Sequence, residues 1–386
     1  MRFSKNIASL VPSATLAISA RAKKMRAAGE SVIDLSAGEP SFPTPDVAIA
    51  AGLEYVRSGK AGYPPTPGIP GLRSAVASYV NQTTAHEGVE SSNVLISAGV
   101  KQALFNACFC LFESGDEVLV PAPYWPTYLA TLELARAKPV VVPTRWEEGF
   151  RLDVTTLERL RTPATRGLFL NSPGNPSGDV YGRDLMAEIA DWASANDVWI
   201  LSDEIYRRLY YEGESAPSIY DVPHQDARVL HLDGISKAFS MPGWRIGYAV
   251  GPEEVIQKMS ALQSQTTSGA AGPSQHAAAA VLSSPQRDDI VGDFRDILRR
   301  RRDTAVEALS GVGGLELRPP AGAIYLYVRL TETSDSMSVA EQLLVQEGVA
   351  TIPGEPFGTP GFLRMNYSVS DEELSEGLAR IRAFFS

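Results

Sequence analysis

Lys237 is the residue of this sequence whose surroundings point most directly to chemistry. It stands in Ser236-Lys237-Ala238-Phe239, directly after a β-rich run, which predicts a position at a strand end rather than on a polar helix face. A lysine amine in such a place can form an imine (Schiff base) with an aldehyde group. An isolated Lys-Ala-Phe would equally fit a surface lysine, so the interpretation depends on the residues around it.

Asp203 is a second candidate, because it follows the apolar run 198–201 and is expected at a buried strand end. A buried carboxylate without a cationic partner is costly. A protonated pyridine nitrogen would supply the partner, and a pyridine ring that stays protonated can act as an electron sink. The alternative is that Asp203 caps the N-terminus of the following segment, which is a common use of aspartate.

Further polar residues lie near these two in the predicted fold. Tyr206 and Asn175 offer a phenol and an amide that can hydrogen-bond a ring hydroxyl, although a half-buried aromatic residue and an Asn-Pro turn would also explain them. Gly99-Val100-Lys101 precedes the helical run 102–111, where backbone N–H groups can bind a phosphate. Arg245 can hold the same phosphate through two hydrogen bonds.

Seven β-rich runs separated by helical patterns must position these residues. This alternation predicts an α/β fold in which helices cover both faces of a mostly parallel seven-stranded sheet. The runs are residues 94–96, 117–120, 140–142, 167–170, 198–201, 229–232 and 246–250. In such sheets ligands bind at the carboxyl ends of the strands. Because the candidate residues follow four of the runs, we expect them to meet in one crevice.

The length of 386 residues exceeds what one hydrophobic core usually organises. After Pro285 the pattern changes to a charged helix from residue 287 to about 309, a strand at 323–330, a helix, a strand at 363–367 and a closing helix. We therefore expect a large domain of residues 46–285. Residues 1–45 and 286–386 are expected to form a smaller α+β domain.

Composition argues against several classes of protein. With 35 basic and 45 acidic residues, the net charge of -10 disfavours nucleic acid and anionic membranes as partners. No apolar run reaches the ~20 residues of a membrane span, and the N-terminus does not have the pattern of a signal peptide, so a cytoplasmic location is expected. The four histidines lack ligand spacing, and the two cysteines have no histidine nearby, so no metal site is predicted.

Three motifs in a fixed order resemble those of class I aminotransferases, which are pyridoxal-phosphate-dependent transferases of fold type I. The motifs are the segment 236–248, Asn171-x-Pro-x-Asn-Pro-x-Gly178 and Ser202-Asp-Glu-Ile-Tyr206. The resemblance covers nearly the whole chain. It implies pyridoxal 5′-phosphate as cofactor and a homodimer whose active sites are shared across the interface.

The resemblance also implies a role for each candidate. Lys237 would be the Schiff-base lysine and proton shuttle, with Asp203 on the pyridine nitrogen and Trp125 stacked on the ring. The residues implied around the cofactor are Gly99, Val100, Lys101, Trp125, Asn175, Asp203, Tyr206, Ser236, Lys237 and Arg245, together with Tyr63 from the neighbouring subunit.

One departure from the family pattern is Gly234, because many relatives carry a serine there as a phosphate ligand. Ser236, Ser240 or backbone groups would then take over that contact.

For the substrate, the resemblance implies that Arg364 binds the α-carboxylate, with Gly38 in the loop that closes over it and with Asn175 and Trp125 nearby. A basic residue for a second carboxylate is absent from residues 263–275, where animal-type aspartate aminotransferases carry an arginine.

Lys101 with Ser13 and Thr15 resembles the set that a bacterial branch of aspartate aminotransferases uses for this second carboxylate. We therefore expect aspartate or glutamate as amino donor and 2-oxoglutarate or oxaloacetate as acceptor. Members of that branch that accept prephenate carry a basic residue where this chain has Val11, which disfavours prephenate.

The expected reaction is a ping-pong transamination. Aromatic, alanine and prephenate aminotransferases, and a lyase that cleaves C–S bonds, stay open as alternatives because they would use the same cofactor groups. A DNA-binding regulator is disfavoured by the absence of a basic N-terminal helix-turn-helix. A nucleotide-dependent dehydrogenase is excluded because no Gly-x-Gly-x-x-Gly follows the first strand.

Overall fold

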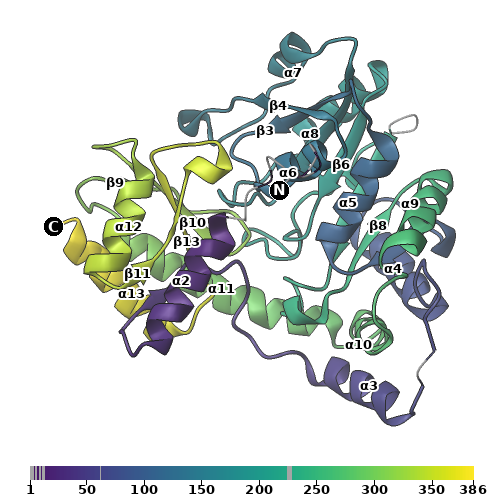
Figure 1. Ribbon diagram of the computed structural model, residues 1–386, viewed down its shortest axis with the longest axis horizontal. Helices are drawn as coiled ribbons and strands as arrows, with labels where there is room; N and C mark the ends of the chain where they lie inside the picture. The colour runs from purple at the N-terminus through teal and green to yellow at the C-terminus, as the bar shows by residue number, and fades with distance from the viewer. Residues whose placement is uncertain (1–3, 5–6, 8–9, 11–13, 61, 224–227) are drawn as a thin grey trace.

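A seven-stranded sheet forms the centre of the molecule (Figure 1) in the computed structural model, which describes residues 4, 7, 10, 14–60, 62–223 and 228–386. Its strands lie in the order β2-β8-β7-β6-β5-β3-β4. Strand β8 is antiparallel to both neighbours and the other pairs are parallel. Their bounds are β2 Val94–Ser97, β3 Glu117–Pro121, β4 Lys138–Val142, β5 Thr165–Asn171, β6 Trp199–Asp203, β7 Arg228–Gly234 and β8 Gly247–Val250. The predicted mostly parallel seven-stranded sheet is confirmed.

Helices cover both faces of this sheet, because its strands are apolar on both sides. The helices of this unit are α4 Pro70–Thr83, α5 Val100–Leu111, α6 Thr127–Leu134, α7 Val154–Leu160, α8 Arg183–Ala195, α9 Glu253–Thr266 and α10 Gly272–Leu282, together with α3 Asp46–Arg57, which packs on α10. None of the helices in the described part of the chain is both long and apolar enough to cross a membrane.

Side chains alternate along each strand, so neighbouring residues belong to different hydrophobic clusters. In β6, Leu201 packs in the cluster that contains residues of α5 and α6. Ile200 packs in the cluster that contains residues of α4, α8 and α10. Asp203 therefore lies on the face of α5 and α6, whereas Ser202 lies on the face of α4 and α10.

A second unit is built around a four-stranded antiparallel sheet with the order β12-β13-β10-β9. Two further strands, β1 and β11, pair in parallel beside it. The elements are α2 Ala14–Ala27, β1 Ile33–Asp34, β9 Leu315–Glu316, β10 Tyr325–Leu330, α12 Ser336–Gln346, β11 Val349–Ala350, β12 Ile352–Pro353, β13 Phe362–Asn366 and α13 Asp371–Phe384. The predicted strands at 323–330 and 363–367 and the closing helix all appear within two residues of their expected bounds.

Helix α11, Arg287–Leu309, runs between the two sheets (Figure 1) and matches the predicted charged helix. The pairing of β1 with β11 brings the start of the chain beside its end, and Figure 1 shows α2 against the C-terminal helices. This arrangement is compatible with the expected composition of the small domain. The domain bounds themselves stay a prediction.

Candidate active site

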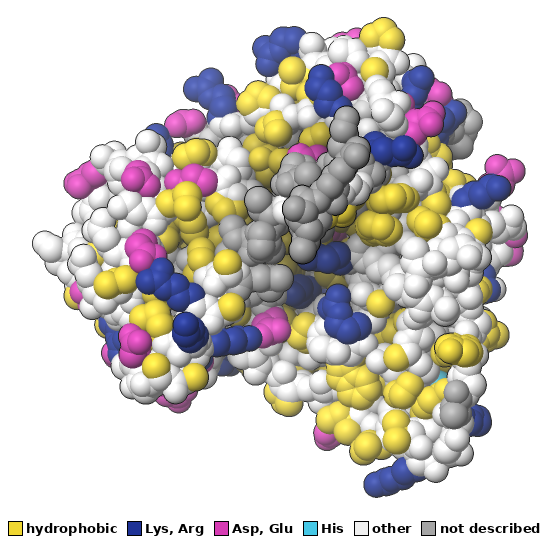
Figure 2. Space-filling model, in the orientation of Figure 1, with side chains coloured by type: hydrophobic (Ala, Val, Ile, Leu, Met, Phe, Trp, Pro, Cys, Tyr) yellow, Lys and Arg dark blue, Asp and Glu magenta, His cyan; other side chains and the backbone are white. Residues whose placement is uncertain are grey.

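A cavity of about 430 Å³ opens where strands β5, β6 and β7 end, and β10 and β13 of the second unit contribute to its wall. Figure 2 shows lysine and arginine side chains in the hollow between the two units. The predicted site residues that line the cavity are Gly38, Val100, Lys101, Trp125, Asn175, Asp203, Tyr206, Ser236, Lys237, Arg245 and Arg364. Residues more than 300 positions apart in the sequence thus meet in one place.

Two described site residues, Gly99 and Tyr63, do not line this cavity, and two others are not placed relative to it. Gly99 does not line the cavity but directly precedes Val100, which does. Tyr63 is 93% exposed and borders a different depression, beside Tyr55. Ser13 lies outside the described residues, and for Thr15 the structure describes only the backbone, in helix α2.

The amine of Lys237 projects into the cavity from the segment after β7. It donates a hydrogen bond to the carbonyl oxygen of Gly38 and lies 5.9 Å from the ring centre of Tyr206. Burial lowers the pKa of this amine to about 8, with Arg364 lowering it further and the carboxylate of Glu39 opposing the change. A neutral, nucleophilic amine is therefore available close to neutral pH.

Asp203 is buried at the end of β6, as the sequence predicts. Its Oδ2 accepts a hydrogen bond of 2.8 Å from the phenol of Tyr128, and its Oδ1 accepts one of 3.3 Å from the N–H of Ile205. Burial nevertheless raises the pKa of Asp203 to about 6, and the neighbouring Asp233 and Glu204 add to the rise. The carboxylate thus both caps a backbone N–H and faces the cavity, so the two sequence interpretations are compatible.

A chain of hydrogen bonds connects the two units across the cavity. Arg364, which is 3% exposed, donates from Nη1 to Oδ1 of Asn175 at 2.9 Å and from Nη2 to the carbonyl oxygen of Ser36 at 2.9 Å. The phenols of Tyr206 and Tyr325 lie 2.7 Å apart. Within the described residues the Nε of Arg364 has no hydrogen-bond partner. This guanidinium therefore has donor capacity left for a carboxylate ligand.

The N-terminus of α5 reaches the cavity because the strands beneath it carry glycine. A Cβ atom on Gly247 would lie 2.2 Å from the backbone nitrogen of Val100, and one on Gly234 would lie 2.8 Å from the carbonyl oxygen of Ile246. A serine at position 234 would therefore require the backbone to move. Glycine rather than serine at position 234 is thus required by the close packing of α5 on the sheet.

The same helix end has the features of an anion site. Gly99 adopts a φ of 84°, which favours glycine, and a Cβ there would lie 2.5 Å from Nη2 of Arg245. The guanidinium of Arg245 and the free N–H groups of the first helical turn face the same region. Ser236 lines the cavity nearby, whereas Ser240 donates its hydroxyl proton to the carbonyl oxygen of Phe42. Ser236 rather than Ser240 is thus placed for an anionic ligand.

Lys101 follows directly in α5, and its amine lies 4.8 Å from the ring centre of Trp125. Loss of solvent around the amine lowers the pKa of Lys101, and the positive charge of Arg245 lowers it further. Two cations in one cavity repel each other, so both gain from a negatively charged ligand.

The structure also brings in residues that the sequence interpretation missed. Tyr128, Asn171 and Tyr325 line the cavity, as do Glu39 and Lys23. Tyr128 lies in the first turn of α6, three residues after Trp125, and none of the motifs noted in the sequence includes it. Asn171, whose side chain donates to the carbonyl oxygen of Asp203, begins a motif already noted. Tyr325 carries no comparable signal in the sequence.

The donor set fits a phosphorylated pyridine aldehyde. The neutral amine of Lys237 would contact its aldehyde, and the buried carboxylate of Asp203 would contact its ring nitrogen. The N-terminus of α5 beside Arg245 would contact its phosphate. Among the residues that the structure describes, no group of three or more His, Cys, Asp or Glu side chains could hold a metal ion.

Comparison with known proteins agrees with this chemistry. The pattern of the family described as aminotransferase class I and II matches residues 30–381. The aspartate aminotransferase of Streptomyces avermitilis is 39% identical, over 100% of this chain and 97% of that protein. A probable aspartate/prephenate aminotransferase of Aquifex aeolicus is 37% identical, over 97% of this chain and 96% of that protein.

Solved structures give the same result. The aspartate aminotransferase of Thermus thermophilus with maleate matches with a TM-score of 0.95 at 37% identity, covering 99% of this chain and 100% of that one. The aspartate aminotransferase of Thermotoga maritima matches with a TM-score of 0.92 at 34% identity, covering 99% of both. The predicted fold type I is confirmed. Because the family pattern spans most of the sequence and relatives above 30% identity match along their whole length, the chain belongs to the aminotransferase class I and II family.

Proposed function

We propose that this aminotransferase binds pyridoxal 5′-phosphate on Lys237 and moves the amino group of aspartate or glutamate to 2-oxoglutarate or oxaloacetate. The observation that carries the proposal is the meeting of Lys237, Asp203 and Arg364 in one cavity. Their side chains would supply a covalent anchor, a partner for the ring nitrogen and a clamp for the substrate α-carboxylate.

Pyridoxal phosphate, when bound, would supply an electron sink for the carbanion that forms when the substrate loses its α-proton. Asp203 would accept a hydrogen bond from the ring nitrogen, and Tyr206 and Asn175 would hydrogen-bond the ring hydroxyl. Trp125 would stack on the ring. The phosphate would lie at the N-terminus of α5 beside Arg245.

Lys237 would also move the proton. Its amine has a pKa of about 8, so a useful fraction is neutral near pH 7 and can take the α-proton on Nζ. The carbonyl oxygen of Gly38 now accepts a hydrogen bond from this amine and would orient it. Arg364 would fix the substrate carboxylate so that the α-proton faces Nζ.

Lys101 is the proposed partner of a second substrate carboxylate, with Ser13 and Thr15 as hydrogen-bond donors. Lys101 lines the cavity beside Trp125, and its lowered pKa reflects a site that lacks a counter-charge. The match to a relative solved with maleate, which is a four-carbon dicarboxylate, supports acidic substrates.

Prephenate is the second candidate substrate. Several relatives at 36–38% identity are named aspartate/prephenate aminotransferases. Against it stands Val11, where a basic residue would be expected and which lies outside the described residues.

A homodimer belongs to the proposal because the chain leaves an apolar face on helix α3. Ile49, Leu53 and Val56 are exposed at intervals that place them on one side of the helix, and Tyr63 follows with its ring in solvent. Figure 2 shows hydrophobic side chains gathered in this region. A second copy would cover this face and receive Tyr63 near its phosphate. Cytoplasmic location stays a prediction.

A half-reaction screen tests the proposed function. The cofactor-loaded protein is mixed with single amino acids, and formation of pyridoxamine phosphate is followed by absorbance and by mass. We expect aspartate and glutamate to react fastest, and Lys101→Ala to slow them at least ~10-fold more than it slows alanine. Faster reaction with aromatic amino acids or prephenate-derived amino acids would assign the alternative substrates. Release of pyruvate and ammonia from a sulfur amino acid would assign the lyase.

A further inference from the structure

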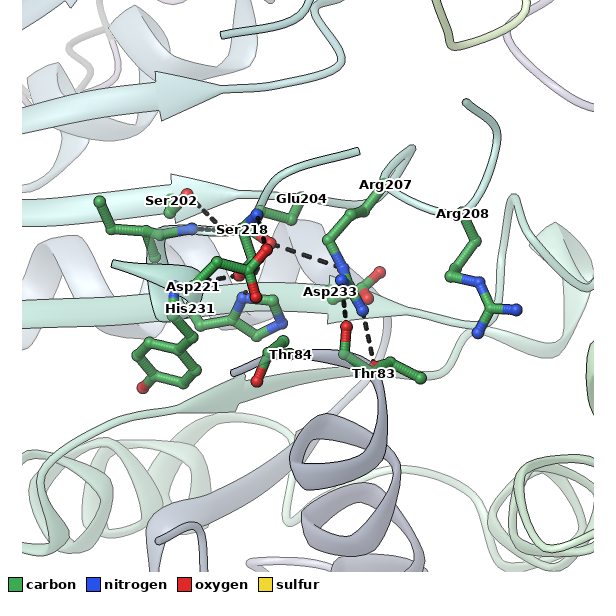
Figure 3. A network of polar contacts seen from close by, with 12 residues as sticks. Thr83, Thr84, Ser202, Glu204, Arg207, Arg208, Ser218, Asp221, His231 and Asp233 are labelled. Carbon is green, nitrogen blue, oxygen red and sulfur yellow. Dashed lines mark hydrogen bonds and ion pairs between the residues drawn. The ribbon is translucent and has the colours of Figure 1, made fainter. Parts of the chain in front are cut away.

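A cluster of buried charged residues lies on the face of the sheet that carries Ser202 and packs against α4 (Figure 3). We call Glu204, Arg207, His231 and Asp233 the rear cluster. Their side chains are almost fully enclosed, with exposed fractions of 0%, 2%, 1% and 5%. Charged groups are seldom buried without a partner or a function.

Glu204 is the centre of the rear cluster. Its Oε1 accepts hydrogen bonds from the hydroxyl of Ser202 at 2.9 Å and from the N–H of Ile219 at 3.0 Å. Its Oε2 lies 3.4 Å from Nδ1 of His231 and 3.7 Å from Nε of Arg207. Within the described residues these three atoms have no hydrogen-bond partner, so charge attraction is what relates Arg207 to Glu204.

Arg207 connects Glu204 with helix α4. Its Nη1 donates to the carbonyl oxygen of Thr83 and its Nη2 to the hydroxyl of Thr83, both at 2.6 Å. Thr83 is the last residue of α4, where a positive charge is favoured by the helix dipole. Figure 3 shows the guanidinium reaching from the segment after β6 to this helix end. An arginine keeps its charge at any pH of interest, so it is a permanent counter-charge.

The rear cluster is close to Asp203 because Glu204 follows it in the chain and Asp233 lies on the neighbouring strand β7. Three buried carboxyl groups therefore occupy adjacent positions. Asp233 accepts hydrogen bonds from the N–H of Gly234 at 2.6 Å and from the phenol of Tyr248 at 3.1 Å. Burial raises its pKa to about 6, as it does for Asp203, and Glu204 and Asp233 both raise the pKa of Asp203.

Glu204 differs from these two acids. Burial alone would raise its pKa, yet the pKa falls to about 2 because His231 and Arg207 face the carboxylate. Glu204 is therefore a fixed negative charge next to Asp203. Without an equally fixed positive charge behind the sheet, Asp203 would take up a proton more readily.

We propose that Arg207 is a positioning residue of the active site: from behind the sheet it offsets the charge of Glu204 and ties the segment 203–206 to helix α4, so that Asp203 stays ionised in the cavity. This inference rests on the proposed function, in which the carboxylate of Asp203 contacts a protonated ring nitrogen. The titratable groups that interact with Asp203 are then Tyr128 from α6, Glu204 and Tyr206 on its own segment, and Asp233 and Lys237 in and after β7.

The test is the affinity of the apoprotein for pyridoxal phosphate, measured by absorbance titration between pH 5 and 8. Affinity is expected to fall as pH drops through the pKa of Asp203. Arg207→Met should move the midpoint of this fall upward by about one pH unit and weaken binding about tenfold at pH 7. Arg208→Met is the matched control, because Arg208 is the neighbouring buried arginine but contacts Asp288 and Tyr79 instead of Glu204.

A second pair of variants distinguishes an effect of the charge of Arg207 from a purely structural role of this residue. Glu204→Gln keeps the acceptor for Ser202 and Ile219 and should move the midpoint downward. The double variant Glu204→Gln with Arg207→Met should bring the midpoint back to within ~0.3 units of the wild type. If Arg207→Met does not fold by itself, the comparison of the double variant with Glu204→Gln decides the question, because these two differ only at position 207 and the double variant should have the higher midpoint.

An unchanged midpoint in the variants that fold overturns the proposal, even when binding weakens evenly at all pH values. That result would mark Arg207 as structural support only. Failure of the proposed function is recognised separately, because neither the wild type nor Arg208→Met would then bind pyridoxal phosphate at any pH.

Discussion

The phenol of Tyr128 donates a 2.8 Å hydrogen bond to Asp203, although the two residues are 75 positions apart. Tyr128 is fixed by stacking on Phe169, with ring centres 4.7 Å apart, and by an edge contact with Trp125 at 5.6 Å. Asp203 therefore has an immobile donor on the cavity side, and the rear cluster lies on the other side of the sheet. The charge of one carboxylate is set from both faces.

Replacing Tyr128 with phenylalanine should weaken cofactor binding about tenfold, because a hydrogen bond to a charged group is lost without a change of shape. The pKa of Asp203, already raised to about 6, would rise further. Equilibrium titration of the apoprotein with pyridoxal phosphate measures the effect. Tyr124→Phe is the control, since Tyr124 is a half-buried neighbour that does not line the cavity. Equal affinities for the two variants would contradict the expectation.

Lys237→Ala should keep the fold and lose turnover by at least ~1,000-fold, because the covalent anchor and the general base disappear together. The measurements are steady-state transamination, a thermal unfolding curve and mass spectrometry after borohydride reduction, which should find no adduct. Lys258→Ala, on the exposed surface of helix α9, should behave as the wild type. Substantial residual transamination in Lys237→Ala would rule out the assignment.

The rate at which apoprotein forms its covalent link with pyridoxal phosphate should rise with pH through about 8 and level off above it. The reason is that only the neutral amine of Lys237 reacts, and burial lowers its pKa to about 8. Glu39 holds this pKa up, so Glu39→Gln should move the midpoint to lower pH by roughly half a unit. Stopped-flow absorbance measures the profile. A midpoint above pH 10, typical of an exposed lysine, would show that the amine is not buried in solution.

Leu53→Asp should shift the protein from dimer to monomer, because it puts a charge in the middle of the exposed apolar face of α3. Sedimentation equilibrium over a concentration series measures the dissociation constant, which should rise at least ~100-fold. Met337→Asp changes another exposed hydrophobic residue, on α12, and should leave the dimer intact. Should both variants remain dimeric, the interface lies elsewhere.

Much of this molecule could be predicted from local patterns. Each strand of the seven-stranded sheet is a short apolar run between turn residues, and that pattern reports burial directly. Because parallel strands end at the same edge, the positions of Asp203 and Lys237 after two such runs were enough to expect them in one crevice. The roles of these two residues as cofactor ligands stay predictions until the loading and turnover measurements are made.

Contacts between distant segments were beyond such patterns, because a pattern along the chain gives the face of a side chain but not what the opposite element presents to it. The sequence by itself determined which side chains are available for this site, which of them follow a strand, and where glycines stand beside them. Packing alone determined that Arg364 bonds Asn175 and that Gly234 has no room for a serine. It also determined that Arg207, beside a motif on the chain, points away from the cavity toward Glu204 and Thr83. The physical reason is that local patterns follow from burial, whereas charge pairing in the interior depends on which elements fold against each other.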